Sequence, residues 1–408
     1  MDRFSSWYTP AVVVLALLAG LISGSVVLGL TLLVVACPGA LVISIPVSIV
    51  AGIGRSARDG ILIKGGEFLE IAAKIDVVAV DKTGTLTKGR PQLTDVVALA
   101  PGVDKNQVLA WAARAEAGSE HPLARPILEA AEQAGIPVAA LPEHIVPVIG
   151  KGITARVDGK RVLIGNLALL EQFGVADTVG ADRQAHELAT QGRTPMIVAV
   201  DDQVLGVIAV ADETRRDAAA MVAALHKAGV KKVVMLTGDV KPVADAVAAA
   251  TGIDEVHAGL LPEDKLDIVA RLQRAGHVVA MVGDGVNDAP ALATADVGVA
   301  MGAAGSAVAV ETADIALMGD DLLKLPEAIS LARRTLSNIR QNIVIALATV
   351  GLLLTGVLMG GVTMAAGMLF HEGSVLIVIA NAMRLLRRAT PAHSAPLSTV
   401  ARESAPSI

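Results

Sequence analysis

The heptapeptide DKTGTLT at residues 81–87 combines a carboxylate with a glycine and three threonines. Residues 77–80 before it are apolar and mostly β-branched, which predicts a buried strand. Asp81 therefore follows the carboxyl end of a strand, where ligands bind in open α/β sheets. The loop offers N–H and hydroxyl donors for a phosphoryl group, so Asp81 is a candidate nucleophile that forms an aspartyl-phosphate. The alternative is a strand-ending aspartate that caps a turn.

Two further strand-like runs end in similar polar loops. Residues 231–236 (KKVVML) lead into Thr237, and residues 278–282 lead into the sequence GDGVNDAP, which contains Asp284. Strand-like runs alternate with alanine-rich helical ones between residues 54 and 335, as expected for α/β layers. A parallel sheet would gather Asp81, Thr237 and Asp284 at one edge.

An insert at about residues 93–205 separates the first of these strands from the others. It contains SEHP at 119–122, GKG at 150–152 and Gly165-Asn166. Each of these short motifs alone is more typical of a turn than of a binding site. Their occurrence together and in this order points to a separate small α+β domain with a functional pocket.

The composition is too apolar for an average soluble protein. The chain has 408 residues, of which 53% are hydrophobic, 18% charged and 2% aromatic. This length suggests two or three domains, and the apolar balance suggests membrane segments mixed with soluble ones. The net charge of -6 argues against nucleic acid as a partner. Cys37 is the one cysteine, which excludes an intrachain disulfide.

Two apolar regions predict membrane spans. Residues 8–53 are too long for one span and predict helices at 8–24 and 26–53, and residues 343–360 and 362–386 predict two more. Both regions are flanked by arginine or lysine, which places these ends in the cytoplasm. A signal peptide is the alternative for the first region, but the apolar run is far longer than a signal peptide needs. Residues 389–408 are rich in Ala, Pro and Ser and predict a disordered tail.

The predicted spans contain residues that could bind a cation. Cys37, Pro38 and Gly39 predict a break in the second helix, and broken helices often form ion sites at the middle of the membrane. A thiolate there suits a soft or borderline cation. The alternative is a proline kink with a buried thiol. His371 and Glu372 lie in the last span, where ionisable groups mark ion pathways unless they are solvated at the outer interface.

The order of these motifs covers nearly the whole chain. CPG is followed by DKTGTLT, SEHP, GKG, GN, DETR at 212–215, TGD, PEDK at 262–265, GDGVNDAP and HEGS. This constellation resembles the heavy-metal branch of the P-type ATPases, the CPx-type pumps of the zinc, cadmium and cobalt kind.

The resemblance implies a multidomain membrane protein with an α-helical transmembrane core. It also implies a doubly wound α/β phosphorylation domain of the haloacid-dehalogenase-like type, interrupted by an α+β nucleotide-binding domain. The implied boundaries are 1–54 and 336–388 for two transmembrane helix pairs, 55–92 with 206–335 for the phosphorylation domain, 93–205 for the nucleotide-binding domain and 389–408 for the tail.

The resemblance also implies roles at the phosphorylation site. Asp81 would accept the γ-phosphoryl group of ATP, Lys265 would neutralise its charge and Thr237 would donate a hydrogen bond to it. Asp81, the backbone at Thr83, Asp284 and Asp288 would hold Mg²⁺, a hard cation that prefers oxygen ligands.

The resemblance further assigns the nucleotide pocket and the cofactors. Glu120, His121, Gly150, Gly152 and Asn166 match the adenine-nucleotide pocket of the family. Glycines there let the nucleotide approach the backbone closely. The expected cofactors are Mg²⁺ and ATP.

The chain departs from the resembling families at three places. Related phosphatases carry a second aspartate where Thr83 stands, so the aspartyl-phosphate should hydrolyse slowly without that base. No TGE tripeptide of the actuator domain occurs, and the sequence starts just before the equivalent of the third core helix. We therefore expect a truncated product, a fragment or half of a split pump. The membrane motif is CPG where CPC or SPC is more usual.

The expected cargo is a divalent heavy metal. Cys37, His371 and Glu372 would supply a thiolate, an imidazole and a carboxylate, which suit Zn²⁺, Cd²⁺ or Co²⁺ better than Cu⁺. Zinc or cadmium and cobalt rank equally, with iron or nickel behind. The predicted function is ATP-driven export by an integral protein of the bacterial plasma membrane with cytoplasmic catalytic domains. Its expected partners are the cation, ATP, lipid and, in a split pump, a separate actuator chain. The alternatives are a non-cycling fragment and a phosphohydrolase on a membrane anchor.

Overall fold

The computed structural model of the chain describes residues 2–37, 39–119, 121, 123–138, 141–284, 288–301 and 311–387. The chain divides into two compact units, Ser56–Leu336 on one hand and Met1–Arg55 with Ser337–Ile408 on the other. The predicted disordered tail and Glu120 lie outside the described residues.

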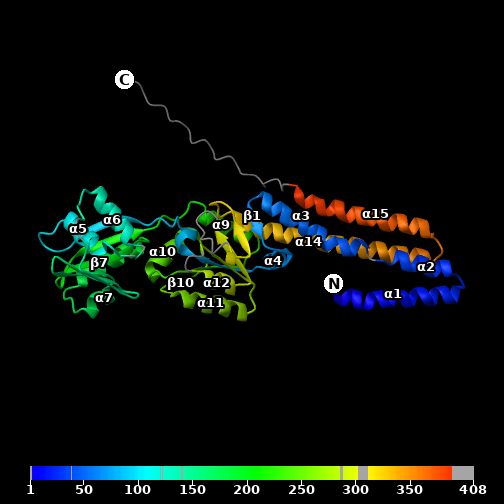
Figure 1. Ribbon diagram of the computed structural model, residues 1–408, viewed down its shortest axis with the longest axis horizontal. Coiled ribbons are helices and arrows are strands. Elements are labelled where there is room, and N and C mark those ends of the chain that lie inside the picture. The colour runs from blue at the N-terminus through cyan, green and yellow to red at the C-terminus, as the bar shows by residue number, and fades with distance from the viewer. Residues whose placement is uncertain are drawn as a thin grey trace, which may run out of the picture. The chain divides into compact units, whose positions relative to one another are not determined.

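The unit Ser56–Leu336 contains a seven-stranded sheet (Figure 1). Its strand order is β1-β13-β12-β11-β2-β9-β10, and every neighbouring pair is parallel except β1 with β13. The strands β2, β11 and β12 are buried along their whole length. This burial is typical of parallel sheets, whose two faces are covered by helices. The strands are β1 (Ile61–Ile63), β2 (Val77–Asp81), β9 (Lys232–Leu236), β10 (Glu255–His257), β11 (Val279–Gly283), β12 (Val297–Met301) and β13 (Ile315–Leu317).

Helices of the described residues accompany this sheet. Ile268, Val269 and Leu292 pack against Val234 and Met281, which places α11 and α12 on one face. The helices are α4 (Gly66–Ala72), α9 (Ala218–Lys227), α10 (Lys241–Thr251), α11 (Pro262–Arg274) and α12 (Ala289–Thr294). The parallel α/β sheet agrees with the predicted doubly wound fold.

A separate six-stranded antiparallel sheet has the order β3-β8-β7-β6-β5-β4. Val198 belongs to the apolar core on one face, and its neighbours Ile197 and Ala199 belong to the core on the other, as the period of two in a strand requires. The strands are β3 (Gln92–Ala98), β4 (His144–Val148), β5 (Gly152–Val157), β6 (Lys160–Gly165), β7 (Thr194–Val200) and β8 (Gln203–Ala211). The helices on its faces are α5 (Lys105–Glu116), α6 (Ala124–Gln133), α7 (Leu167–Gln172) and α8 (Val179–Thr190). The predicted α+β insert is therefore present, whereas its boundaries at 93 and 205 stay a prediction.

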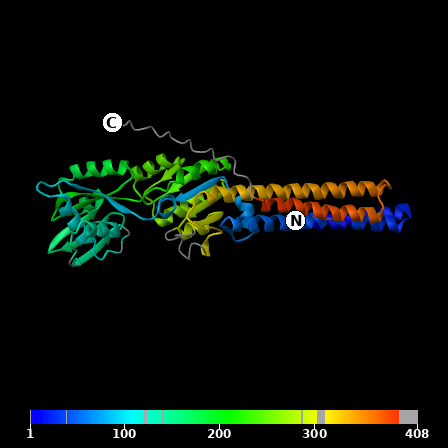
Figure 2. The same ribbon diagram turned by 90° about the horizontal axis from the view of Figure 1, so that it is seen from above.

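The other unit is helical (Figure 2). It comprises α1 (Asp2–Ser23), α2 (Val26–Val35), most of α3 (Gly39–Arg58), the later part of α14 (Lys324–Leu358), α15 (Met364–Met383) and the short turn Arg384–Leu386. The predicted helix over 26–53 is two helices, because α2 ends at Val35 and α3 begins at Gly39. The break falls at the CPG motif, as expected from its proline. Pro46, by contrast, lies inside α3 without ending it.

Within the described residues, three segments are long and apolar enough to cross a membrane: Val26–Arg58, Lys324–Leu358 and Met364–Leu386. The apolar helix Trp7–Ser23 is shorter. Three of the four predicted spans are therefore confirmed by length and composition among the described residues, and the first span stays a prediction.

Small residues and amides join the helices of this unit. A Cβ at Gly29 would lie 2.9 Å from the carbonyl oxygen of Ala16, so α1 and α2 approach closely. Ser48 Oγ donates to Asn338 Oδ1 at 3.0 Å, and Asn381 Nδ2 donates to Asn342 Oδ1 at 2.8 Å. These bonds satisfy polar side chains between α3, α14 and α15.

Candidate functional site

The three polar loops predicted to meet do meet at one edge of the sheet. β2 lies between β11 and β9, and all three strands are parallel. Asp81 ends β2, Thr237 follows β9 and Asp284 follows β11. Their common edge is the carboxyl edge, as the sequence analysis predicted, because adjacent parallel strands end on the same side.

A buried ion cluster lies at this edge. Lys265 Nζ is 2.6 Å from Asp81 Oδ1 and 2.7 Å from Asp288 Oδ1. Asp81 is 6% exposed, Lys265 7% and Asp288 1%. Lys265 comes from the first turn of α11, which Pro262 starts at a position that tolerates a missing N–H. The ammonium can therefore neutralise charge close to the candidate nucleophile.

The electrostatics of the cluster favour an additional cation. Burial and the nearby charges of Asp288 and Asp284 raise the pKa of Asp81 to about 7 against the opposing effect of Lys265. Burial alone would lower the pKa of Lys265, but Asp81 and Asp288 raise it. Carboxylates outnumber the ammonium, so the site carries excess negative charge.

The donors at this edge fit Mg²⁺. A Cβ at Gly84, whose φ is +73°, would lie 2.6 Å from Asp284 Oδ2, so the loop after β2 packs directly on Asp284. Carboxylate and carbonyl oxygens are the ligands that Mg²⁺ takes. In the described part of the chain, no group of three or more His, Cys, Asp or Glu side chains is already arranged around a metal position. The chemistry of the donors thus fits Mg²⁺. Thr83, two positions after Asp81, is exposed.

Thr237 is buried next to this cluster. Its N–H donates to the carbonyl of His257 at 3.0 Å, and its Oγ1 accepts from the N–H of Asp239 at 3.1 Å. Asp239 also pairs with Lys82, which links the loop after β9 to the loop after β2. The sequence analysis did not single out this Lys82–Asp239 pair.

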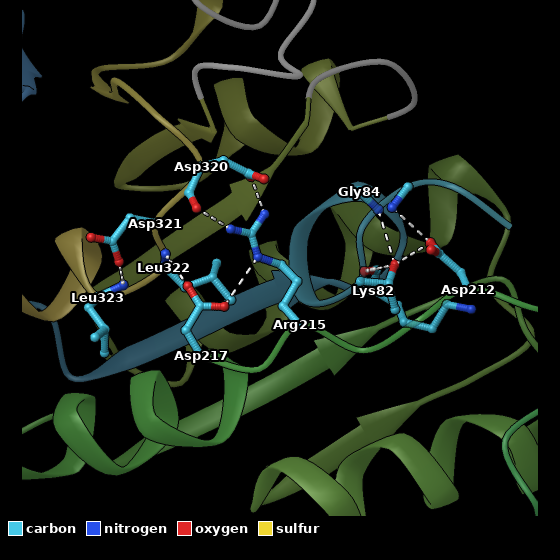
Figure 3. A network of polar contacts seen from close by, with 11 residues as sticks. Lys82, Gly84, Asp212, Arg215, Asp217, Asp320, Asp321, Leu322 and Leu323 are labelled. Carbon is cyan, nitrogen blue, oxygen red and sulfur yellow. Dashed lines mark hydrogen bonds and ion pairs between the residues drawn. The ribbon is translucent and has the colours of Figure 1, made fainter.

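Asp212 and Arg215 of the motif DETR take part in a second network of polar contacts (Figure 3). The sequence analysis noted this motif but assigned it no role. Asp212 accepts from Thr87 Oγ1 and from the N–H groups of Gly89 and Arg90, both at 3.0 Å. These bonds fix the chain where it leaves the loop after β2. Arg215 lies between Asp217 and Asp320, and burial of its guanidinium is outweighed by these carboxylates, which raise its pKa (Figure 3).

The structure brings three of the predicted nucleotide residues together. Asn166 Nδ2 donates to the carbonyl of Gly150 at 3.0 Å, and Gly152 pairs with Gly165 across β5 and β6. Asn166 also caps α7, since its Oδ1 accepts from the N–H of Leu169. Asn166 and Gly152 thus have structural functions besides any contact with a nucleotide. His121 remains exposed, although desolvation of its ring lowers its pKa.

The predicted cation ligands differ in their surroundings. Cys37 is exposed between α2 and α3, and His371 of α15 is buried with its ring against Gly39. Glu372 is exposed on α15. The structure thus brings His371 to the CPG motif but does not bring Glu372 there in the described residues.

Comparison with known proteins shows the family to which this chain belongs. The haloacid dehalogenase-like hydrolase family matches residues 75–296. That range is more than half of the chain, so the chain belongs to the haloacid dehalogenase-like hydrolases.

The curated relatives are narrower in kind. A cadmium-transporting ATPase of Staphylococcus aureus is 43% identical over 95% of this chain and 55% of its own length. A zinc-exporting P-type ATPase of Mycobacterium marinum is 42% identical over 95% of this chain and 53% of its own. A manganese-exporting P-type ATPase of Mycobacterium tuberculosis is 43% identical over 95% of this chain and 54% of its own length. The chain therefore spans about half the length of the curated relatives it matches, and its homology to heavy-metal P-type ATPases confirms the predicted resemblance.

Solved structures of P-type ATPases are also similar to this chain. A zinc-transporting PIB-type ATPase in the E2.Pi state is 43% identical with a TM-score of 0.75, over 95% of this chain and 64% of that chain. The catalytic domain of the CPx-ATPase CopB-B is 28% identical with a TM-score of 0.52, over 68% of this chain and 98% of that domain.

Proposed function

We propose that this chain forms the phosphorylation, nucleotide-binding and cation-conducting parts of an ATP-driven exporter of divalent heavy metals. The observation that carries the proposal is the buried cluster of Asp81, Lys265 and Asp288 at the carboxyl edge of the seven-stranded sheet. Apolar helices of spanning length in the same chain add a path for a cation. The names of the zinc-exporting and manganese-exporting relatives add the direction of transport.

The residues of the cluster have distinct tasks in phosphoryl transfer. A carboxylate oxygen of Asp81 attacks the γ-phosphorus of ATP, and the bond from that phosphorus to the ADP oxygen breaks. Lys265 neutralises charge on the transferring group, and the hydroxyl of Thr237 donates to it. Bound Mg²⁺, held by Asp81, the carbonyl of Thr83, Asp284 and Asp288, would supply further charge neutralisation.

Nucleotide binding belongs to the insert with the antiparallel sheet. Gly150 and Asn166 lie in hydrogen-bond contact, and Gly152 lies two positions after Gly150. His121 and Glu120 would complete the pocket. Backbone without side chains at the two glycines would let the adenine ring approach closely.

The cargo is proposed from its ligands. Cys37 and His371 offer a thiolate and an imidazole, which suit Zn²⁺, Cd²⁺ and Co²⁺. Mn²⁺ belongs in any test because one relative is a manganese exporter by name. Membrane lipid would surround the apolar helices, with the catalytic unit in the cytoplasm.

The alternative phosphohydrolase on a membrane anchor is less well supported. Thr83 cannot act as the general base that an aspartate would provide at that position. The relatives that match the chain are transporting ATPases by name.

Transfer of ³²P from [γ-³²P]ATP to the purified chain tests the proposal. The expected label is acid-stable, sensitive to hydroxylamine and dependent on Asp81 and on one divalent heavy metal. Asp81→Asn should abolish it, whereas Asp104→Asn is a matched control, because Asp104 caps an exposed helix end and asparagine caps equally well. Absence of label with Zn²⁺, Cd²⁺, Co²⁺, Mn²⁺ or no metal would overturn the enzyme assignment.

A further inference from the structure

We propose that Arg215 is a positioning residue that couples the loop after β2, which contains the candidate nucleophile Asp81, to the start of α14. Arg215 ends the motif DETR, for which the sequence predicted no role. Its backbone is bonded to the loop, and its side chain is bonded to the segment that leads into α14. The inference rests on the proposed export function, in which events at Asp81 and at the apolar helices have to be linked.

The backbone of Arg215 is attached to the loop after β2. Its N–H donates to the carbonyl of Leu86 at 2.9 Å. One position earlier, Thr214 forms an isolated antiparallel bridge with Thr87. Leu86 and Thr87 end the heptapeptide that begins at Asp81. A displacement of this loop, such as the addition of a phosphoryl group to Asp81 would cause, therefore acts directly on the backbone of Arg215.

The side chain of Arg215 reaches the segment before α14 (Figure 3). Its Nη2 donates to the backbone carbonyl of Asp320 at 2.6 Å, and its Nη1 pairs with the carboxylate of the same residue. Its Nε lies 3.4 Å from Oδ1 of Asp217, whose Oδ2 accepts from the N–H of Leu322 at 2.9 Å. The guanidinium thus holds residues 320–322 directly and through Asp217.

The burial of Arg215 argues for more than a stabilising ion pair. Arg215 is 8% exposed, whereas the side chain of its partner Asp320 is 64% exposed. Removing a guanidinium from water is costly, and an ion pair offsets this cost only in part. An apolar side chain of similar size would fill the same space without the cost. The bonds of Arg215 therefore suit a contact that holds two segments in one orientation.

The segment that Arg215 holds is continuous with a candidate membrane span. Residues 320–323 lead directly into α14, which runs as one helix from Lys324 to Leu358 and is long and apolar enough to cross a membrane. Leu322 and Leu325 at its start are fully or almost fully buried. Packed side chains, hydrogen bonds and rigid helices are the means by which distant sites are coupled. Arg215 provides the shortest such link, because one residue is bonded to both segments.

Hydrogen exchange of the full chain in lipid nanodiscs, with and without beryllium fluoride and Mg²⁺, tests the inference. Beryllium fluoride binds to an aspartate carboxylate and mimics its phosphorylated form. In the wild type we expect slower exchange in peptides that cover residues 81–90. Through Arg215, exchange should also slow roughly 5-fold in peptides that cover residues 318–327. The N–H of Leu322 reports the contact, because it is bonded to Asp217.

Variants at both ends of the contact separate coupling from binding. Arg215→Met should remove the slowing at 318–327 and keep it at 81–90, since methionine fills the space but has no donor. Asp320→Ala should have the same effect, and the double variant should add nothing. Arg215→Lys should restore part of the slowing, because an ammonium lacks the planar fork of the guanidinium. Arg216→Met and Asp321→Asn are matched controls, because both residues are exposed at the adjoining positions.

The inference is overturned if exchange at 318–327 does not respond in the wild type, or responds equally in Arg215→Met. Loss of slowing at both places in Arg215→Met would also overturn it, because Arg215 would then support the site of Asp81 rather than its link to α14. If Arg215→Met fails to fold, Asp320→Ala decides, since the side chain of Asp320 is mostly exposed. The measurement needs neither ATP nor a heavy metal, so its result is independent of the ³²P test of export.

Discussion

At the scale of single residues, glycines and carboxylates of this chain have structural duties that overlap with the proposed chemistry. Gly152 is a candidate nucleotide residue, yet a Cβ there would lie 2.1 Å from the carbonyl oxygen of Ile164 and 2.6 Å from Cα of Gly165. Its φ is +139°, which L side chains rarely adopt. The close approach of β5 and β6 alone therefore requires glycine.

Replacing Gly152 by alanine should destabilise the antiparallel sheet by roughly 3 kcal/mol or more, because the backbone of β6 must move. Gly159→Ala is a suitable control, since φ is +74° but no atom lies within 4 Å of its Cβ, and we expect a cost of about 1–2 kcal/mol there. Thermal unfolding with and without ATP measures both effects. Equal stability of the two variants, with ATP binding lost only in Gly152→Ala, would show that Gly152 acts through the nucleotide.

Asp76 is a carboxylate with a structural duty at the start of β2. Burial would raise the pKa of Asp76, but hydrogen bonds from His277, Lys231 and the N–H of Val278 together lower it. Since the pKa is lower in the folded state, the carboxylate stabilises the fold above its unfolded pKa of about 3.9. This stabilisation is lost as the pH falls through the folded value.

Asp76→Asn should therefore speed amide exchange in β2 at pH 7, corresponding to a loss of about 1–2 kcal/mol. The difference from the wild type should shrink as the pH falls below about 4, because the unfolded chain takes up the proton there and the folded carboxyl does so only at lower pH. Comparison of the two proteins at each pH cancels the intrinsic dependence of exchange. A difference that stays constant down to pH 3 would contradict this ionic role.

At the scale of elements, α14 is tied to the sheet by one side chain. The Arg333 guanidinium donates to the carbonyl of Ala73 at 3.2 Å and of Ile75 at 2.8 Å, and also to the carbonyls of Ala228 and Gly229. Ala73 and Ala228 are the C-caps of α4 and α9. Helix C-termini carry partial negative charge and unpaired carbonyls, which the half-buried guanidinium of Arg333 satisfies.

These carbonyls directly precede β2 and β9, the strands that end at Asp81 and before Thr237. Arg333→Met should lower the thermal stability of Ser56–Leu336 by about 2–4 kcal/mol and slow phosphorylation of Asp81. Arg333→Lys should recover part of both, because an ammonium reaches fewer carbonyls than the planar guanidinium. Arg334 is exposed on the next position of α14, so Arg334→Met controls for the loss of charge. Equal effects of the two methionine variants would contradict the role of Arg333.

At the scale of the whole molecule, the chain combines a buried seven-stranded sheet with helices that expose large apolar side chains. Exposed examples are Leu21, Ile22, Leu352, Leu369 and Leu376. Soluble proteins rarely expose large contiguous apolar patches. Lipid would cover it at no cost in hydration.

We expect the expressed chain to sediment with membranes and to resist extraction by alkaline carbonate, while detergent should release it. Immunoblotting of the pellet and supernatant with an antibody against the catalytic unit measures this. Release by carbonate alone would show that the apolar helices do not span the bilayer.

The sequence by itself determined the strands at 77–80, 231–236 and 278–282, their shared edge and the break at the CPG motif. These features depend on local composition and on the period of apolar residues, which neighbours along the chain are enough to reveal. The motif order also identified the homologous transporters, because loops that bind phosphate constrain residue types at fixed spacings.

Only the tertiary structure decided which distant residues touch. Lys265 pairs with Asp81 across 184 positions of the chain, Arg333 reaches Ala73 across 260, and the ring of His371 lies on Gly39. The same structure leaves Glu372 exposed, although its sequence position next to His371 suggested a shared site. Such contacts follow from strand order and from the rotation of each helix about its axis, where adjacent residues point about 100° apart. Local sequence patterns carry no information on either.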